Sequence, residues 1–400
     1  MADQHKERRP WGRRLALAGA GLFAAILLPG AATALLPMPS LELWAIGLLV
    51  LEFSLVFAAV AVAGVVLAVI ARRRRPGGGR GLSAGGRRMA AVLGAVNAAM
   101  LVAALLPAVS AWGTARKHGV PLSLAGYLDG LSTSAGRGPE ETIRYARVGG
   151  EDLMLDVWRP AATVPVAGRL PVVVNVHGGA EDAPQSPFPR WDAWLADSGH
   201  VVFDVDYRFF RPYDWKSSPG DVKCALGWVV RNAERYGADP TRITLMGQSA
   251  GGYLSLLAAF TTAAELPPSC DVPEVKPTAV VSWFGPGDAT AEIPSAFRLS
   301  EAVRRLLAEE TWPLAEEDWE RASPSTYIRP GLPRTLLIQG GRDILQPAEH
   351  TRAFAARLAD AGVRHELVEI PYADHQFDLV WGGFGSQIAR HVIRGFLSGG

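Results

Sequence analysis

The stretch LMGQSAGG, residues 245–252, carries one serine among glycines and other small residues. Gly247 to Gly251 fit the pattern G-x-S-x-G, which holds a serine hydroxyl in a sharp turn between a strand and a helix. The strand-like segment RITLM precedes the pattern and the helical segment AGGYLSLLAAF follows it. Glycines suit such a turn because flanking Cβ atoms would collide with neighbouring strands. We therefore predict that Ser249 is a nucleophile.

A serine hydroxyl needs a base to take its proton, and a histidine base needs a carboxylate to orient it. Of the eight histidines, His375 in PYADHQFD lies just after the last strand pattern and before the last helix pattern. Asp343 follows the strand pattern RTLLI at its carboxyl end, whereas Asp374 and Asp378 follow no strand directly. We expect His375 to be the base and Asp343 the acid. The order Ser249, Asp343, His375 is the order expected for such a sheet.

The same chemistry needs donors for the negative oxygen of a tetrahedral intermediate. His177, Gly178 and Gly179 follow the strand pattern VVVNV, in the loop where esterases carry such donors. We expect the backbone N–H groups of Gly178, Gly179 and Ala250 to form this oxyanion hole. Each donor of this kind contributes about 2.7 to 4 kcal/mol to the rate. For His177 we expect a structural role in shaping the loop.

Short β-branched runs alternate with helical patterns through residues 142–400, which indicates a mostly parallel sheet with helices on both faces. Functional groups in such a sheet gather at the carboxyl ends of the strands. The segments ETIRYARVGG and DLMLDVWRP alternate in polarity and predict an antiparallel hairpin at one edge. The predicted parallel strands are PVVVNVHG, HVVFDVDY, RITLMG, TAVVSWFG, RTLLIQG and HELVEI, and the predicted helices are 192–198, 219–236, 250–264, 348–361 and 385–397.

Taken together, five stretches of the chain resemble the esterase and lipase group of the α/β-hydrolases. They are HGGA, VDYRF, DVKCALGWVVRNAERYGADPTRITLMGQSAGG, SPSTYIRPGLPRTLLIQGGRD and DHQFD. The resemblance is to hormone-sensitive-lipase-like and feruloyl-esterase-like carboxylesterases, and it covers the chain from about Glu141 onward. It implies the α/β-hydrolase fold, ester hydrolysis without a cofactor or metal, and the site residues already named. Ala180 stands where the lipase-like branch often has a third glycine.

Other activities are compatible with the same three residues. An acyltransferase would pass the acyl group to an alcohol, and a prolyl-oligopeptidase-like peptidase would cleave peptides. Such a peptidase normally carries an N-terminal propeller, for which the 29 residues of 113–141 leave no room. A non-catalytic membrane protein that keeps the fold for binding is a further alternative. The leading hypothesis is a membrane-anchored serine hydrolase that cleaves small-molecule or lipid esters.

The first part of the chain differs from the rest in charge and hydropathy. Residues 1–117 carry 14 Lys or Arg and 4 Asp or Glu, and they contain three long apolar runs, 15–36, 41–71 and 89–112. About 20 helical residues cross a hydrocarbon core, so each run predicts a transmembrane helix. A signal peptide is the alternative for the first run. Glu52 is costly at the centre of a bilayer, so a span from Phe53 to Ala71 is an alternative for the second.

The position of the arginines predicts the orientation of these spans. Seven arginines lie between the second and third runs, and the connection between the first two has none. The positive-inside rule therefore places the N-terminus and this loop in the cytoplasm and everything after Trp112 on the outer face of the cell membrane. Topology accounts for the arginines without a nucleic-acid partner. We predict a membrane anchor over 1–112, a linker with one small helix over 113–141 and a catalytic domain over 142–400.

Substrate recognition and assembly are less determined by the sequence. Aromatic residues in 209–215 and 282–288 are equally consistent with an acyl pocket and with local packing. The charged segment 290–321 is equally consistent with a lid and with solvated helices. Cys224 and Cys270 allow one disulfide or two free thiols. The natural ester and the oligomeric state stay open.

Overall fold

The computed structural model describes residues 11–36, 41–73, 82–130, 136–162, 168–179, 184–209, 215–288 and 318–399. Ala180, most of the aromatic segment 209–215 and most of the charged segment 290–321 lie outside these residues. The chain divides into two compact units, Met1–Gly113 and Thr114–Gly400.

The first unit is built from apolar helices, α1 (Trp11–Leu35), α2 (Leu41–Glu52), α3 (Ser54–Arg72) and most of α4 (Ala84–Lys117). Three helices are long and apolar enough to cross a membrane, over Gly12–Thr33, Ser54–Arg72 and Ala84–Lys117. Asn97 of α4 donates to the carbonyl oxygen of Ala20 in α1 at 3.1 Å. A Cβ on Gly64 of α3 would lie 2.0 Å from Asn97 Oδ1, so glycine permits this close approach.

The apolar run 41–71, predicted as one span with Phe53–Ala71 as the alternative, forms two helices, and α3 agrees with the alternative. Phe53 leaves the helical conformation, with φ −94° and ψ 23°, and separates α2 from α3. The break puts Glu52 at the end of a helix, whereas one continuous helix would have carried this acid inside the span, where a charge is costly.

The second unit is built around one eight-stranded sheet in the order β1-β2-β4-β3-β5-β6-β7-β8. Strands β3 to β8 are parallel, while β1 and β2 form an antiparallel hairpin at one edge. This arrangement confirms the mostly parallel sheet and the edge hairpin predicted from the sequence. The strands are β1 (Glu141–Val148), β2 (Glu151–Trp158), β3 (Leu170–Val176), β4 (Val201–Val205), β5 (Ala238–Gln248), β6 (Ala279–Trp283), β7 (Arg334–Gly340) and β8 (His365–Ile370).

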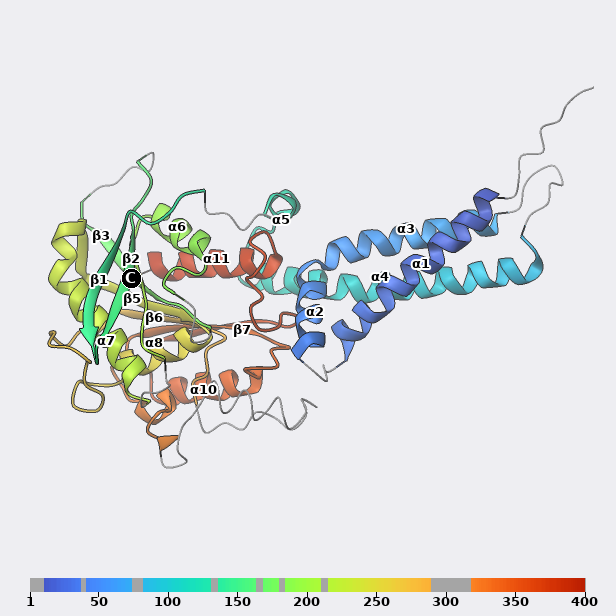
Figure 1. The fold of residues 1–400 in the computed structure, drawn as a ribbon. Helices are drawn as coiled ribbons and strands as arrows, with labels where there is room; N and C mark the ends of the chain where they lie inside the picture. Colours follow the sequence, from blue (N-terminus) through green and yellow to red (C-terminus); the bar gives the residue numbers. More distant parts are fainter. Residues whose placement is uncertain are drawn as a thin grey trace, which may run out of the picture. The chain divides into compact units, whose positions relative to one another are not determined.

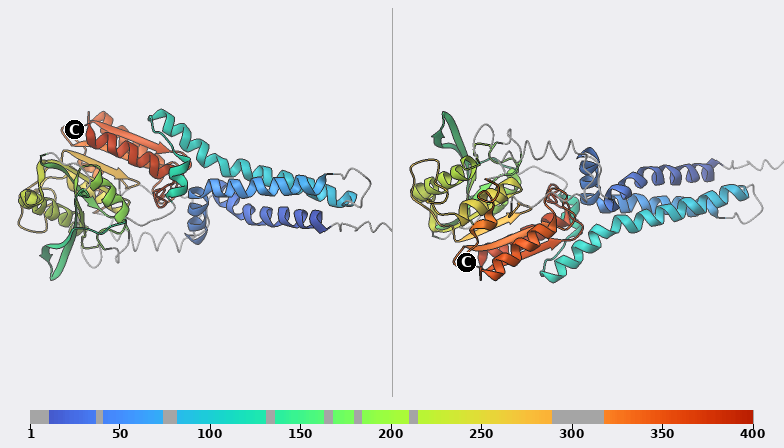
Figure 2. Two further views of the ribbon diagram at one scale, coloured as in Figure 1. Left: turned by 90° about the horizontal axis from the view of Figure 1, so that it is seen from above. Right: turned by 90° about the horizontal axis from the view of Figure 1, so that it is seen from below.

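Helices cover both faces of this sheet, as Figure 1 shows. Helices α6 (Pro189–Asp197) and α11 (Phe384–Ser398) lie on one face, where Arg394 of α11 stacks over Trp194 of α6. Helices α7 (Ser217–Asn232), α8 (Ala250–Phe260) and α10 (Ala348–Asp360) lie on the other face. The view from above in Figure 2 has α11 in front of the sheet, and the view from below has α10 in front. Alternating apolar strands and helices produce this layering because both faces of a parallel sheet must be buried.

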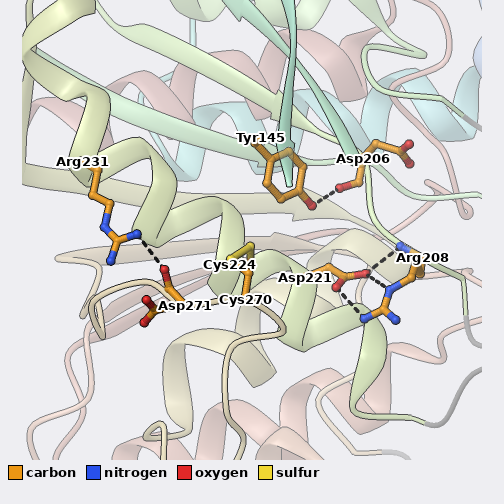
Figure 3. Close-up of a disulfide and its surroundings, with 8 residues drawn as sticks. All are labelled: Tyr145, Asp206, Arg208, Asp221, Cys224, Arg231, Cys270 and Asp271. Carbon is orange, nitrogen blue, oxygen red and sulfur yellow. Dashed lines mark hydrogen bonds and ion pairs between the residues drawn. A yellow bond between two sulfur atoms is a disulfide. The ribbon is translucent and has the colours of Figure 1, made fainter. Parts of the chain in front are cut away.

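Cys224 of α7 and Cys270 form a disulfide, which resolves the choice that the sequence left open. Figure 3 shows the bridge and three polar contacts around it, of which two involve the chain that follows β4. The buried carboxylate of Asp221 accepts two bonds from the Arg208 guanidinium, at 2.8 and 2.9 Å. Tyr145 of β1 donates to the carbonyl oxygen of Asp206 at 2.7 Å. These contacts fix the chain that follows β4.

Candidate active site

Ser249 occupies a strained turn between β5 and α8. Its φ of 50° and ψ of −120° are rare for a residue with a side chain. A Cβ on Gly251 would lie 1.9 Å from the carbonyl oxygen of Val176, and a Cβ on Gly247 would lie 2.4 Å from the backbone of Gly251. The glycines therefore allow β3, β5 and α8 to approach closely. The half-buried Ser249 side chain is presented at the carboxyl end of the sheet.

The structure brings Ser249, His375 and Asp343 together in one line of hydrogen bonds. Ser249 Oγ lies 2.9 Å from His375 Nε2, and His375 Nδ1 lies 2.8 Å from Asp343 Oδ2. The second Asp343 oxygen accepts the backbone N–H groups of Leu345 and Gln346, at 2.9 and 2.7 Å. Ser249, His375 and Asp343 come from the loops after β5, β8 and β7. Strands β7 and β8 are neighbours in the sheet, and β6 separates β7 from β5. A base can thus remove the serine proton while its ring stays oriented.

The surroundings of His375 adjust its basicity. Burial of the ring lowers its pKa, but the charge and hydrogen bond of Asp343, with smaller contributions from Asp374 and Asp378, raise the pKa above the ordinary value. The Phe284 ring packs on the imidazole with 4.6 Å between centroids. A buried imidazole beside a carboxylate is able to accept a proton and to keep the resulting charge.

The loop after β3 passes directly against the serine turn. A Cβ on Gly178 would lie 2.6 Å from the carbonyl oxygen of Gln248 and 3.1 Å from Ser249 Cβ. Gly179 has a φ of 111°, which favours glycine. Ala250 is the first residue of α8, where backbone N–H groups have no partner within the helix. The two glycines predicted as oxyanion donors thus lie on the loop that borders the serine, and Ala250 directly follows it.

His177 is held inside this loop. Its ring stacks on Tyr207 with 4.7 Å between centroids, and the Tyr207 hydroxyl donates to the His177 carbonyl oxygen at 2.9 Å. His177 Nε2 lies 3.7 Å from Asp206 Oδ1. Burial lowers its pKa, but Asp206, Asp204 and the Gly178 carbonyl oxygen outweigh burial and raise the pKa. These contacts agree with the structural role expected for His177.

A third carboxylate near His375 was not predicted to take part in the site. Asp378 Oδ2 accepts hydrogen bonds from Gln248 Nε2 and, at 3.1 Å, from Trp283 Nε1. Gln248 immediately precedes Ser249, so Asp378 ties the serine turn to the loop that carries His375. Burial raises the pKa of Asp378 to about 6. Its position three residues after His375 was the available signal.

A pair of buried acids below the loop after β3 was also missed. Asn175 Nδ2 donates to Asp192 Oδ1 at 2.9 Å and to Asp204 Oδ2 at 2.7 Å. Burial raises the pKa of Asp192 to about 7 and the pKa of Asp204 well above its ordinary value, the latter also because Asp192 is close. Asp204 in the apolar strand VVFDV was the sequence signal, because a charged residue in a fully buried strand needs partners. Among the described residues, no group of three or more His, Cys, Asp or Glu is arranged to hold a metal ion.

Comparison with known proteins gives consistent matches for the second unit. The family model BD-FAE matches residues 155–358. Esterase LipC of Mycobacterium tuberculosis is 33% identical over 256 residues, which cover 61% of this chain and 62% of that protein. The probable carboxylic ester hydrolase LipM of the same organism is 30% identical over 246 residues, covering 60% of this chain and 55% of that protein. This chain thus spans about three fifths of the length of these curated relatives.

Solved structures support the same fold. The native thermophilic esterase Est2 of Thermogutta terrifontis is 26% identical with a TM-score of 0.52, and the match covers 66% of this chain and 95% of that chain. The propionate-bound form of the same esterase is 25% identical with a TM-score of 0.51, covering 63% and 93%. The second unit therefore has the α/β-hydrolase fold.

Proposed function

This chain belongs to the BD-FAE family of α/β-hydrolases, and on that premise we propose that it is a membrane-anchored serine hydrolase of carboxylic esters. The observation that carries the proposal is the line of hydrogen bonds from Ser249 Oγ through the His375 ring to Asp343. Similar proteins named as esterases support ester hydrolysis in preference to another use of this line.

In the acylation step, His375 Nε2 accepts the hydroxyl proton while Ser249 Oγ attacks the ester carbonyl carbon. The carbonyl oxygen becomes negative and accepts hydrogen bonds from the backbone N–H groups of Gly178, Gly179 and Ala250. The tetrahedral intermediate then collapses, the bond to the alcohol oxygen breaks, and His375 gives its proton to the leaving alcohol. The acyl group remains on Ser249.

In the deacylation step, His375 removes a proton from water, and the resulting hydroxide adds to the acyl carbon. Collapse of the second intermediate releases the carboxylic acid, and Ser249 Oγ recovers its proton from His375. Asp343 keeps the ring in the tautomer whose Nε2 faces the serine and stabilises the imidazolium formed in each step.

The apolar helices of the first unit support anchoring in a membrane. We place the N-terminus and the Arg-rich loop between α3 and α4 in the cytoplasm, because basic residues favour that side. The second unit then lies on the outer face. The Cys224–Cys270 disulfide is consistent with this placement, since such bridges persist in oxidising compartments. We propose residues 1–112 as the anchor, 113–141 as the linker and 142–400 as the catalytic domain.

The test is turnover of p-nitrophenyl butyrate by the purified full chain. Ser249→Ala should lower kcat on the order of 10⁶-fold, as loss of such a nucleophile does elsewhere. Ser398→Ala is the matched control, because this exposed serine lies at the far end of α11. A fluorophosphonate probe should label the wild type and the control but not Ser249→Ala. Unchanged turnover in Ser249→Ala would refute the assignment, and an acyl product that depends on an added alcohol would favour acyl transfer.

A further inference from the structure

Three large apolar side chains are exposed in the described part of the second unit. Leu124 is 65% exposed, Leu128 is 63% exposed and Leu379 is 37% exposed. Leu124 and Leu128 belong to α5 (Leu124–Asp129), and residues four apart lie on the same face of a helix. Leu379 lies in the loop that carries His375. Two large exposed apolar side chains on one helix face mark a surface that contacts an apolar partner.

Helix α5 is fixed to the unit by its opposite face. Tyr127 is buried, with its ring 5.4 Å from the ring of Phe384 at the start of α11. Ser123 and Gln387 exchange two hydrogen bonds, at 2.8 and 3.0 Å. The exposure of Leu124 and Leu128 is therefore a property of a docked helix and not of a loose end.

Backbone contacts also join α5 to the loop that carries the proposed base, His375. Gly382 donates to the carbonyl oxygen of Gly130, which ends α5, at 3.0 Å. A Cβ on Gly130 would lie 2.2 Å from Gly382 Cα, so the two segments touch through their backbones. Gly382 lies seven positions after His375 in the chain, and Leu379 lies between them. Leu379 thus lies on the same short loop as the proposed base, and α5 contacts that loop through Gly130 and Gly382.

The chain that enters α5 also leads directly from an apolar helix. Trp112 precedes Leu124 by about twelve residues, and Arg116 and Lys117 follow it with exposed side chains. Tryptophan gathers at both membrane–water interfaces, and long basic side chains near the ends of a span reach the interface. The intervening chain is folded onto β8, where Thr114 Oγ1 donates to the Glu369 carbonyl oxygen at 3.2 Å. α5 is therefore tethered within a short chain length of the point where the span would leave the bilayer.

From this arrangement we propose that Leu124, Leu128 and Leu379 insert into the lipid surface of the membrane and that the enzyme takes its ester from the bilayer. The substrate class is an ester whose acyl chain partitions into lipid. The proposal rests on the proposed ester hydrolysis. It adds the partner, a membrane surface, and the side from which substrate arrives at the loop of His375.

The first test compares two esters with the full chain in vesicles of phosphatidylcholine and phosphatidylglycerol. One is water-soluble p-nitrophenyl butyrate, and the other is 4-methylumbelliferyl palmitate dissolved in the vesicles. The double variant Leu124→Ser/Leu128→Ser should lose roughly tenfold in kcat/KM toward the palmitate ester, because inserted leucines no longer hold the loop at the lipid. Its rate with butyrate should stay within about twofold of the wild-type rate, which also reports correct folding.

A methionine double variant separates the loss of apolar surface from a change in side-chain shape. Leu124→Met/Leu128→Met keeps the apolar face and should retain the palmitate rate. Full palmitate activity in the serine double variant would overturn the proposal. Equal loss in the methionine variant would also overturn it, since both side chains are apolar.

The second test measures insertion without enzyme activity, so it remains informative if the esters are not cleaved. Leu124→Cys is labelled with an environment-sensitive fluorophore, which is selective because Cys224 and Cys270 are bridged. Nitroxide lipids should quench this label at least threefold more than the same label at Lys276→Cys, an exposed position before β6 at the other end of the sheet. Equal quenching would overturn the proposal. Loss of a dimer in the serine variant, with equal quenching, would assign the face to a second copy of the chain.

Discussion

Two groups of buried carboxylates lie near the carboxyl ends of the strands, and their partners differ. Asp343, in the loop after β7, accepts hydrogen bonds from two backbone N–H groups, from Gln339 Nε2 and from the His375 ring. Asp192 and Asp204, beside β3 and β4, share the single amide of Asn175. The first carboxylate faces a group that can become positive, whereas the second faces another acid.

This difference assigns the two groups different tasks. A carboxylate surrounded by donors stays ready to stabilise a cation, which is what a histidine base requires. Two neighbouring buried acids cannot both be charged without a large cost, so we expect the pair to keep one proton near neutral pH. Asp204 also accepts the backbone N–H of Ser186 at 2.7 Å, and Ser186 has a φ of 52°. The acid pair therefore braces the end of the loop that begins with Gly178 and Gly179.

The difference between Asp343 and the pair of Asp192 and Asp204 should have its largest effect when Asp343 is changed. Asp343→Asn should lower kcat for p-nitrophenyl butyrate about 10⁴-fold, because an amide neither fixes the required tautomer nor stabilises the imidazolium. Asp374→Asn is the matched control, since Asp374 Oδ1 accepts the backbone N–H groups of His375 and Ile344 and an amide oxygen can do the same. We expect the control to lose less than about tenfold. Equal losses in the two variants would show that Asp343 is not distinguished by its contact with His375.

Asp378 lies near His375 and accepts hydrogen bonds from Gln248 and Trp283. Its effect should be seen in the pH dependence of the activity. The charge of Asp378 raises the pKa of His375, so its removal should lower that pKa. His375 acts as a base only when it is neutral, and activity therefore falls as the pH drops through its pKa. Asp378→Asn should move the acid limb of kcat/KM to lower pH and reduce the plateau roughly tenfold, since the bond to Gln248 weakens.

The measurement is the pH dependence of butyrate hydrolysis between pH 5 and 9. Asp360→Asn, at the exposed end of α10, provides the control for removing one negative charge. An acid limb that stays in place, or moves to higher pH, would contradict the role assigned to Asp378.

The fold was predictable from the sequence wherever a single segment carries a clear hydropathy pattern. Continuous apolar runs predicted the parallel strands, and alternating polarity predicted the β1–β2 hairpin. Ser249, Asp343 and His375 were chosen because each lies after a strand pattern, and the structure places them within hydrogen-bonding distance. Their catalytic roles and the oxyanion donors Gly178, Gly179 and Ala250 stay predictions.

The features that were missed depend on pairing between distant segments. Asp204 meets Asn175 only because β3 and β4 pair with these two residues in register, and Asp192 arrives from α6. No local pattern contains that register. The break at Phe53 separates two helices within one apolar run. Hydropathy predicted a single span over 41–71, and the alternative span from Phe53 to Ala71, which rested on Glu52, agrees with α3. The Cys224–Cys270 bridge required the approach of α7 to a loop that has no regular pattern.

The smallest expected effect concerns the acid pair and appears in stability. The pKa of Asp192 is about 7 in the folded chain, against about 3.9 when unfolded. Between these values the folded state binds more protons than the unfolded state, so the stability contributed by the protonated pair declines as the pH rises from about 4 to 7. Asp204, Asp156 and His177 are the titratable groups that act on this pair. Asp192→Asn resembles the protonated acid at every pH and should remove part of the decline.

We expect the wild-type free energy of unfolding to fall by roughly 1 to 2 kcal/mol more than that of Asp192→Asn between pH 5 and pH 8. This corresponds to about 2 to 8 °C in Tm for a unit of this size, measured by thermal unfolding of the detergent-solubilised full chain. Asp360→Asn should follow the wild-type curve. If Asp192→Asn also follows it, the pair carries no shared proton, and the contrast with Asp343 reduces to the presence of His375. If Asp192→Asn is instead less stable than the wild type only above pH 7, then Asp192 is ionised in the folded state. The contrast between Asp343 and the protonated pair of Asp192 and Asp204 would then be reversed.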